Sequence, residues 1–218
     1  VADADYEAAL QAAEVEEVAN VVFLDQYNST RNGYLETHAS NTQDRMVVMA
    51  GQEGDTVSAI ETDVANYRDT EGRIIYSYPY LQYTIGGVAE FLPPAAQVAS
   101  VISQTSPHID PAFAGNAGFS TGVEALKTPL TRSDYITLKN AGVAAWENDP
   151  DLGFKLKSGI VTQILNSSKV MIFRRRMADY LTRSLGRFLK NYQNNVNSLR
   201  NRQEAAGGIL DFVGSQER

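Results

Sequence analysis

The chain has 218 residues, of which 43% are hydrophobic and 21% are charged, and it contains no cysteine. The absence of cysteine excludes disulfides, thiol nucleophiles and thiolate metal sites. No apolar run approaches the roughly 18 residues that a membrane-spanning helix needs, and the first residues lack a signal-peptide pattern. We therefore expect a soluble, globular protein without membrane insertion. Because the chain opens on Val1 inside a helical pattern, we also expect it to be a fragment of a longer protein.

The net charge of −7 conceals two regions of opposite charge. Residues 1–150 carry 7 Lys and Arg against 21 Asp and Glu, whereas residues 151–218 carry 12 against 5. Such asymmetry suits an acidic or basic ligand. It also suits a head-to-tail contact in which the acidic side of one subunit meets the basic side of an identical neighbour. The simpler interpretation of the asymmetry is that both charged regions form ordinary solvent-exposed faces.

The first 92 residues alternate between helix and strand patterns. In chain order we expect a helix at 6–20, a buried strand at 21–24, a turn at 28–33, a helix at 34–41, a buried strand at 45–51, a helix at 56–67 and a third strand at 73–85. Asp55 or Thr56 can cap the helix that starts near residue 56. The alternation predicts an α/β fold, an open sheet with helices packed on its faces, with α+β as the alternative. Pro79 interrupts the third strand, which we expect to bend or leave the sheet there.

Residues 93–150 read as an irregular and helical connection, and residues 151–218 as a basic, helical C-terminal part. The expected elements are a short helix at 95–104 opened by prolines, an irregular stretch at 105–122, a helix that Thr131 caps and Gly142 ends, a strand at 143–146, short strands within 154–165, and long amphipathic helices at 169–199 and 200–213. Gly207 and Gly208 should break or loosen the last helix. We expect residues 1–218 to form a single domain.

The helix expected at 169–199 presents two different faces. An apolar stripe with helical spacing predicts core residues at Met177, Leu181, Leu185 and Phe188. The other face is cationic, and it provides our candidate interface with a tube or a neighbouring subunit: Arg174, Arg175, Arg176, Arg183, Arg187 and Lys190. The alternative is that these cations pair with acidic residues of the same chain.

The sequence contains no motif that is typical of a catalytic or phosphate-binding site. The loop at 51–56 lacks both glycine patterns of phosphate binding, and no nucleophile elbow occurs. His38 and His108 are the only histidines, lie 70 positions apart, and are expected at the surface or in loops. The tyrosines at 76–83 could stack on bases, but the acidic surroundings would repel a nucleic-acid backbone. We expect no catalytic, cofactor or metal site, no direct nucleic-acid binding, and a protein that is not an enzyme.

Four stretches resemble the contractile tail sheath proteins of myophage-type tails, in that family's order and over nearly the whole chain. They are DYEAAL with VVFL, FLPPAAQVASVI with AFAG, LTRSDYITLKNAGVAAW, and SGIVTQIL with MIFRRRMADYLTRSL. Three places depart from the family pattern. At the first, GFKLKSGIVTQI stands where many members have a "WGARTL"-like strand. Phe113 stands where the family's loop has Pro, and Ala144 stands where its "GVN" has Asn.

The resemblance implies a structural subunit that polymerises around a tail tube and contracts to drive the tube through the host envelope for genome ejection. Its implied partners are identical sheath subunits, the tail tube protein and the baseplate. The implied location is the virion tail, assembled in the bacterial host cytoplasm. Family members link through terminal arms that add strands to neighbouring sheets, so we expect this fragment to be monomeric. The competing hypothesis is a small-molecule-binding enzyme or binding module on a flavodoxin-like α/β core, which would need a pocket with convergent polar groups.

Overall fold

The computed structural model describes residues 2–15, 21–24, 28–42, 44–113, 122–163, 168–190 and 199–216. The chain divides into two compact units, residues 1–176 and residues 177–218. This boundary differs from the divisions at 92 and 150 that composition suggests. Residues 93–150 supply helices and strands to the first unit and do not merely connect two halves.

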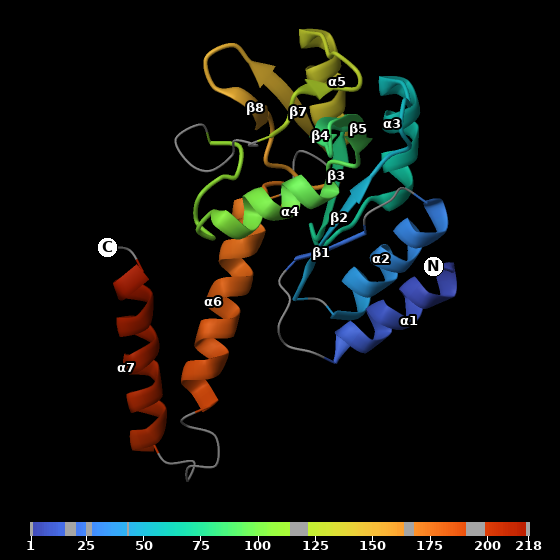
Figure 1. Cartoon of the computed structure of the whole chain (residues 1–218). Helices are drawn as coiled ribbons and strands as arrows, with labels where there is room; N and C mark the ends of the chain where they lie inside the picture. The colour runs from blue at the N-terminus through green and yellow to red at the C-terminus, as the bar shows by residue number, and fades with distance from the viewer. Residues whose placement is uncertain are drawn as a thin grey trace. The chain divides into compact units, whose positions relative to one another are not determined.

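Helices and strands alternate through the first unit, which confirms the expected α/β fold (Figure 1). The helices are α1 (Asp3–Glu14), α2 (Ser29–Thr42), α3 (Val57–Val64) with the 3-10 turn η1 (Ala65–Tyr67), α4 (Ala95–Gln104), α5 (Arg132–Ala141), α6 (Ile172–Lys190) and α7 (Leu199–Gln216). The strands are β1 (Val21–Phe23), β2 (Met46–Ala50), β3 (Ile74–Tyr78), β4 (Leu81–Ile85), β5 (Val88–Leu92), β6 (Ala125–Leu126), β7 (Val143–Asp149) and β8 (Gly153–Leu156).

The main sheet has the strand order β1-β2-β3-β7-β8, with β1, β2, β3 and β7 parallel and β8 antiparallel. Alternate residues of β2 enter two cores. Met46 and Val48 pack with α4 on one face, whereas Val47 and Met49 pack with α2, α3 and α5 on the other. Strands covered on both faces need a continuous apolar run, which is why residues 46–50 read clearly as a strand.

Strand β1 was expected to be buried, and this is wrong. Among the described residues it pairs with β2 alone, at the edge of the sheet, and Phe23 is 40% exposed. A short apolar run therefore indicated a strand correctly but did not indicate its place in the sheet.

The chain leaves the main sheet at Pro79, which follows a cis peptide bond, and this confirms the expected departure. Strand β4 then opens a second sheet with the order β5-β4-β6. The single strand expected at 73–85 is thus two strands in different sheets, and the β4–β5 hairpin was not predicted. Gly86 and Gly87 form its turn with φ of 59° and 85°, a conformation that glycine adopts at little cost.

Helix caps follow the sequence closely in two places. Thr56 accepts a hydrogen bond from the Ala59 amide, and Thr131 forms a capping box with Asp134. The start of α2 differs from the expectation. The stretch at 28–33 is the cap and first turn of that helix and not a separate turn, because the side-chain oxygen of Asn28 accepts from the amides of residues 30 and 31.

His38 is a correction to the sequence analysis, because it is neither at the surface nor in a loop. It lies in α2, is 1% exposed, and faces Glu14 of α1, with 3.6 Å between Nδ1 and the carboxylate oxygen. Burial lowers the pKa of the His38 imidazole, and the nearby Arg45 lowers it further. A neutral histidine therefore belongs to the packing of α1 on α2.

Helix α6 is also less buried than its apolar stripe predicts. Ile172 is its one buried residue, and the expected core residues Met177, Leu181, Leu185 and Phe188 are only half-buried. Helix α7 runs without a break through Gly207 and Gly208, contrary to the expectation. A Cβ atom at Gly208 would lie 2.3 Å from the Phe188 ring, so this glycine allows α7 to approach α6 closely.

We predict opposite outcomes for two aspartate substitutions in α6. Ile172→Asp should destabilise the first unit by more than about 3 kcal/mol, because it places an unpaired carboxylate in a fully buried apolar site. Leu185→Asp should leave that unit folded, because its carboxylate can reach water. Trp146, the only tryptophan and 0% exposed, reports the outcome by fluorescence. Equal losses for the two variants would contradict the assignment of Ile172 alone to the core.

Candidate assembly surfaces

Arg176 binds the C-terminal end of α4. Its Nη2 lies 2.7 Å from the carbonyl oxygen of Thr105, and its Nη1 lies 3.4 Å from that of Ser106. The last carbonyls of a helix lack partners within the helix and carry partial negative charge, so a guanidinium is a suitable cap. Burial lowers the pKa of Arg176. This candidate interface residue therefore serves the fold of the first unit.

Arg175 also contacts the first unit. Its Nη1 lies 3.7 Å from a carboxylate oxygen of Glu71, and Lys169 donates a hydrogen bond of 2.8 Å to the same oxygen. The hydrogen bond from Lys169 lowers the pKa of the Glu71 carboxyl, and the charge of Arg175 adds to this effect. Arg175 thus pairs with an acidic residue of the same chain, as the alternative proposes, whereas Arg176 binds backbone carbonyls.

The other candidate cations have different surroundings. Arg174 is exposed and lies 5.9 Å from the ring of Phe173, and Arg183 is half-buried. Arg187 and Lys190 are exposed in the last turn of α6 and make no ion pair with any residue that the structure describes. The six candidates therefore differ in their surroundings. Arg174, Arg187 and Lys190 are exposed, and the last two share the last turn of α6.

The β7–β8 hairpin at one end of the main sheet has an ion-pair network. Lys155 lies 2.6 Å from Asp149 and 3.4 Å from Glu147, and Lys157 lies 2.7 Å from Glu147. The hydrogen bond from Lys155 lowers the pKa of the Asp149 carboxyl. Charges on an edge strand hinder indiscriminate pairing with other strands while leaving its backbone groups available.

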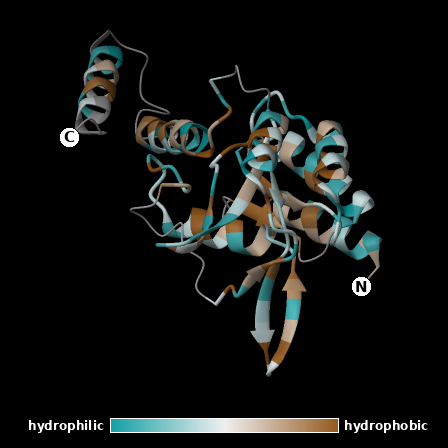
Figure 2. Ribbon diagram, turned by 90° about the horizontal axis from the view of Figure 1, so that it is seen from above, coloured by the Kyte–Doolittle hydropathy of each residue, from teal (hydrophilic) through white to brown (hydrophobic). Residues whose placement is uncertain are grey.

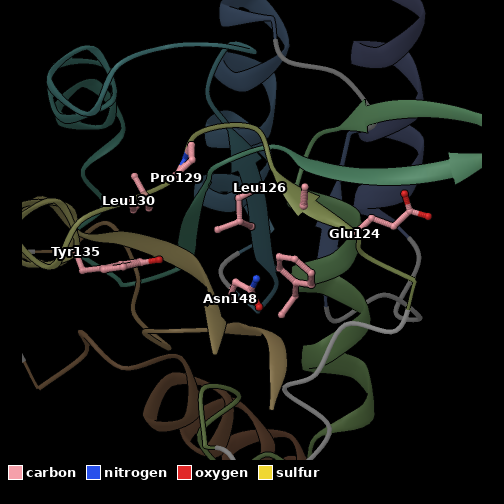
Figure 3. Close-up of a pocket in the computed structure, with 8 residues that line it drawn as sticks. Glu124, Leu126, Pro129, Leu130, Tyr135 and Asn148 are labelled. Atoms are coloured by element: carbon pink, nitrogen blue, oxygen red, sulfur yellow. The ribbon is translucent and has the colours of Figure 1, made fainter. Parts of the chain in front are cut away.

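A shallow pocket of about 300 Å³ lies between β6, α5, β7 and β8 (Figure 3). Its lining is Glu124, Ala125, Leu126, Pro129, Leu130, Tyr135, Asn148 and Phe154. Burial and the charge of Glu147 raise the pKa of Tyr135 to about 12, and its hydroxyl donates to the Trp146 carbonyl oxygen. These eight residues include no nucleophile beside a base. Of the polar lining residues, Glu124 accepts a hydrogen bond from Thr84 and Tyr135 is engaged with a backbone carbonyl, so both have partners in the protein itself.

Two further observations concern other kinds of site. Within the described ranges, no group of three or more His, Cys, Asp or Glu side chains is arranged to hold a metal ion. None of the described helices is long and apolar enough to span a membrane.

No protein-family model and no curated protein matches the chain. Solved structures do match it. The contracted sheath complex of the extracellular contractile injection system PVC has a TM-score of 0.78 and 15% identity, over 96% of this chain and 58% of that one. The contracted helical sheath of the anti-feeding prophage has a TM-score of 0.71 and 17% identity, over 97% of this chain and 58% of that one. The sheath tail protein of Desulfitobacterium hafniense has a TM-score of 0.70 and 14% identity, over 100% of this chain and 49% of that one.

The chain therefore has the fold of contractile sheath proteins, as its four sequence stretches predicted. It spans about half the length of the three structures compared.

We predict that the cations of α6 differ in their contribution to stability. Arg176→Gln should lower the free energy of unfolding by about 1–3 kcal/mol, because it removes charge-assisted hydrogen bonds to the end of α4. Arg187→Gln with Lys190→Gln should change it by less than about 0.5 kcal/mol per site, because exposed charges contribute little. Urea unfolding measures both, followed by Trp146 fluorescence for the first unit and by far-ultraviolet circular dichroism for the helices of the second. A large loss in the double variant would show that those cations are internal scaffolding.

Proposed function

We propose that this protein is a structural, non-enzymatic subunit of a contractile sheath that polymerises around a rigid inner tube. The observation that carries the proposal is the match of nearly the whole chain to the sheaths of an injection system and of the anti-feeding prophage, and to a sheath tail protein. The pocket is shallow and has no nucleophile beside a base among the residues that line it, which agrees with a role in assembly. Contraction would drive the tube through a host envelope. In a phage this would serve genome ejection, from a virion tail assembled in the host cytoplasm.

The last turn of α6 is the proposed contact with the tube. Arg187 and Lys190 are exposed there, with Arg183 one turn before them on the same helix. Exposed ion pairs are individually weak, so a ring of subunits can hold a tube through many contacts and release them together. Arg175 and Arg176 contribute indirectly, because they bind Glu71 and the end of α4. Arg174 is exposed and is a further proposed contact.

Neighbouring subunits are the proposed lateral partners, and the baseplate is the proposed partner at the end of the sheath. Strands β1 and β8 are the terminal strands of the main sheet, so their outer edges offer backbone groups to an incoming strand. The 218-residue chain should be monomeric if the arms that supply those strands are not part of it.

Electron microscopy of the intact gene product, expressed alone, tests the proposed function. We expect long hollow tubes, because sheath subunits carry their own lateral contacts. The variant with Arg187→Gln and Lys190→Gln should form the same empty tubes but co-assemble less with the inner tube protein. Its deficit should be greatest at low salt, where charges are least screened.

Sedimentation of the 218-residue chain is the matched control, with a monomer as the expected result. A compact soluble oligomer of the intact gene product, with no tubes at any salt concentration, would contradict the sheath function. A stable closed oligomer of the 218-residue chain would contradict linkage through arms.

A further inference from the structure

The β4–β5 hairpin carries an apolar face that continues past the rest of its sheet. Along β4, Leu81, Tyr83 and Ile85 alternate with polar residues, a pattern typical of a strand with one covered face. Leu81 is fully buried at the base, and Tyr83 donates a hydrogen bond to Gln97 of α4. Ile85 is 50% exposed. The apolar face of β4 thus extends beyond the part that the described residues cover.

Strand β5 extends the same face. The register places Val88 opposite Ile85 and Glu90 opposite Tyr83, so all four side chains lie on one side of the hairpin. Val88 is 59% exposed, and Glu90 is exposed without an ion pair to any described residue. We call Ile85, Val88 and Glu90 the hairpin face. Figure 2 shows the hairpin reaching away from the other strands, with hydrophobic residues at its tip.

Helix α5 offers a surface of matching chemistry. Its inner side packs Leu138 and Ala141 into the core, whereas Arg132, Ile136 and Lys139 follow at steps of four and three on the other side. Ile136 is 56% exposed, and both cations are exposed without an ion pair to any described residue. We call these three residues the α5 face. It is an apolar side chain between two positive charges.

We propose that the hairpin face of one copy docks on the α5 face of a second copy. Two residues of a strand span about 7 Å, which separates Val88 from Glu90. Four residues of a helix span about 6 Å, which separates Ile136 from Arg132. Val88 placed on Ile136 therefore brings Glu90 to Arg132. The contact covers both exposed apolar side chains and pairs charges that have no partner among the described residues.

A second copy is the occupant that the size and charge of these faces favour. Three side chains bury far less than the roughly 800 Å² per partner of a stable interface, so the contact is weak when only two molecules meet. Repetition in an array adds many such contacts. Because the two faces are different patches of one chain, the contact is head-to-tail and extends a chain of subunits. The inference rests on the proposed self-assembling function.

Disulfide trapping tests the contact, since the natural chain contains no cysteine. A tagged Val88→Cys protein is mixed with an untagged Ile136→Cys protein and oxidised, so every mixed disulfide joins two molecules. We expect the 88–136 disulfide to form in preference to 88–88 and 136–136. The matched control is Ala89→Cys, which is also exposed but lies on the opposite side of β5. It should give little disulfide with residue 136.

Charge reversal provides the second readout. Adding Glu90→Arg to the Val88→Cys protein should lower the yield by as much as about fivefold. Adding Arg132→Glu to the Ile136→Cys protein should then restore it. Equal yields from residues 88 and 89, a dominant 88–88 disulfide, or no response to charge reversal would overturn the contact.

The trapping experiment uses dispersed molecules and needs no tubes, which separates it from the test of the sheath function. Tubes from the intact gene product without the 88–136 disulfide would refute the contact and leave the sheath function standing. Formation of the 88–136 disulfide without tubes would refute the sheath function and leave the contact standing.

Discussion

The attachment of the first turn of α6 to the sheets is the interaction on which the remainder of this structure depends. Ile172 is fully buried among residues of β2, β3 and α4, and its amide donates a 3.0 Å hydrogen bond to Gly159. One residue earlier, Met171 forms a bridge with Ile160. One turn later, Arg176 caps α4. A single helical turn thus joins the long basic helix to the core that the main sheet organises.

This attachment explains why cations of similar sequence context have different roles. A buried charge is costly unless it is paired, so a guanidinium near the core must find carbonyls or a carboxylate, as Arg175 and Arg176 do. Arg187 and Lys190 lie beyond the boundary between the two units and remain hydrated. Exposed, hydrated cations such as these two can change partners at little cost to the stability of the fold. That is the property that the proposed reversible contact with a tube requires.

Much of the first unit could be predicted because its signals are local. Residues 46–50 form a continuous apolar run, Thr131 and Asp134 form a capping box, and Gly142 ends α5 with φ of 90°. Pro79 likewise marks where the chain changes sheets. The general resemblance to sheath proteins followed from four stretches in a fixed order, and the fold confirms it.

Other features could not be predicted because they depend on distant residues. An amphipathic stripe shows that Met177 and Leu185 share a face of α6, but not how much of that face the chain covers. Nothing near Arg176 in the sequence indicates that the end of α4, some 70 positions earlier, needs a cap. The burial of His38 depends on α1 packing over α2. The β4–β5 hairpin did have a local signal, since Gly86-Gly87 between two alternating stretches is typical of a two-residue turn.

Amide hydrogen exchange along α6 tests the central claim most directly, because it reads the attached and unattached parts of one helix in the same experiment. We predict that the hydrogen-bonded amides of Ile172 and Arg175 exchange as slowly as those of β2 and β3. Those at 181–190 should exchange much faster in the isolated protein and slow down when the inner tube protein is bound. Equal protection along the whole of α6 in the isolated protein would contradict the account, because the cationic end would then be as firmly held as the buried turn.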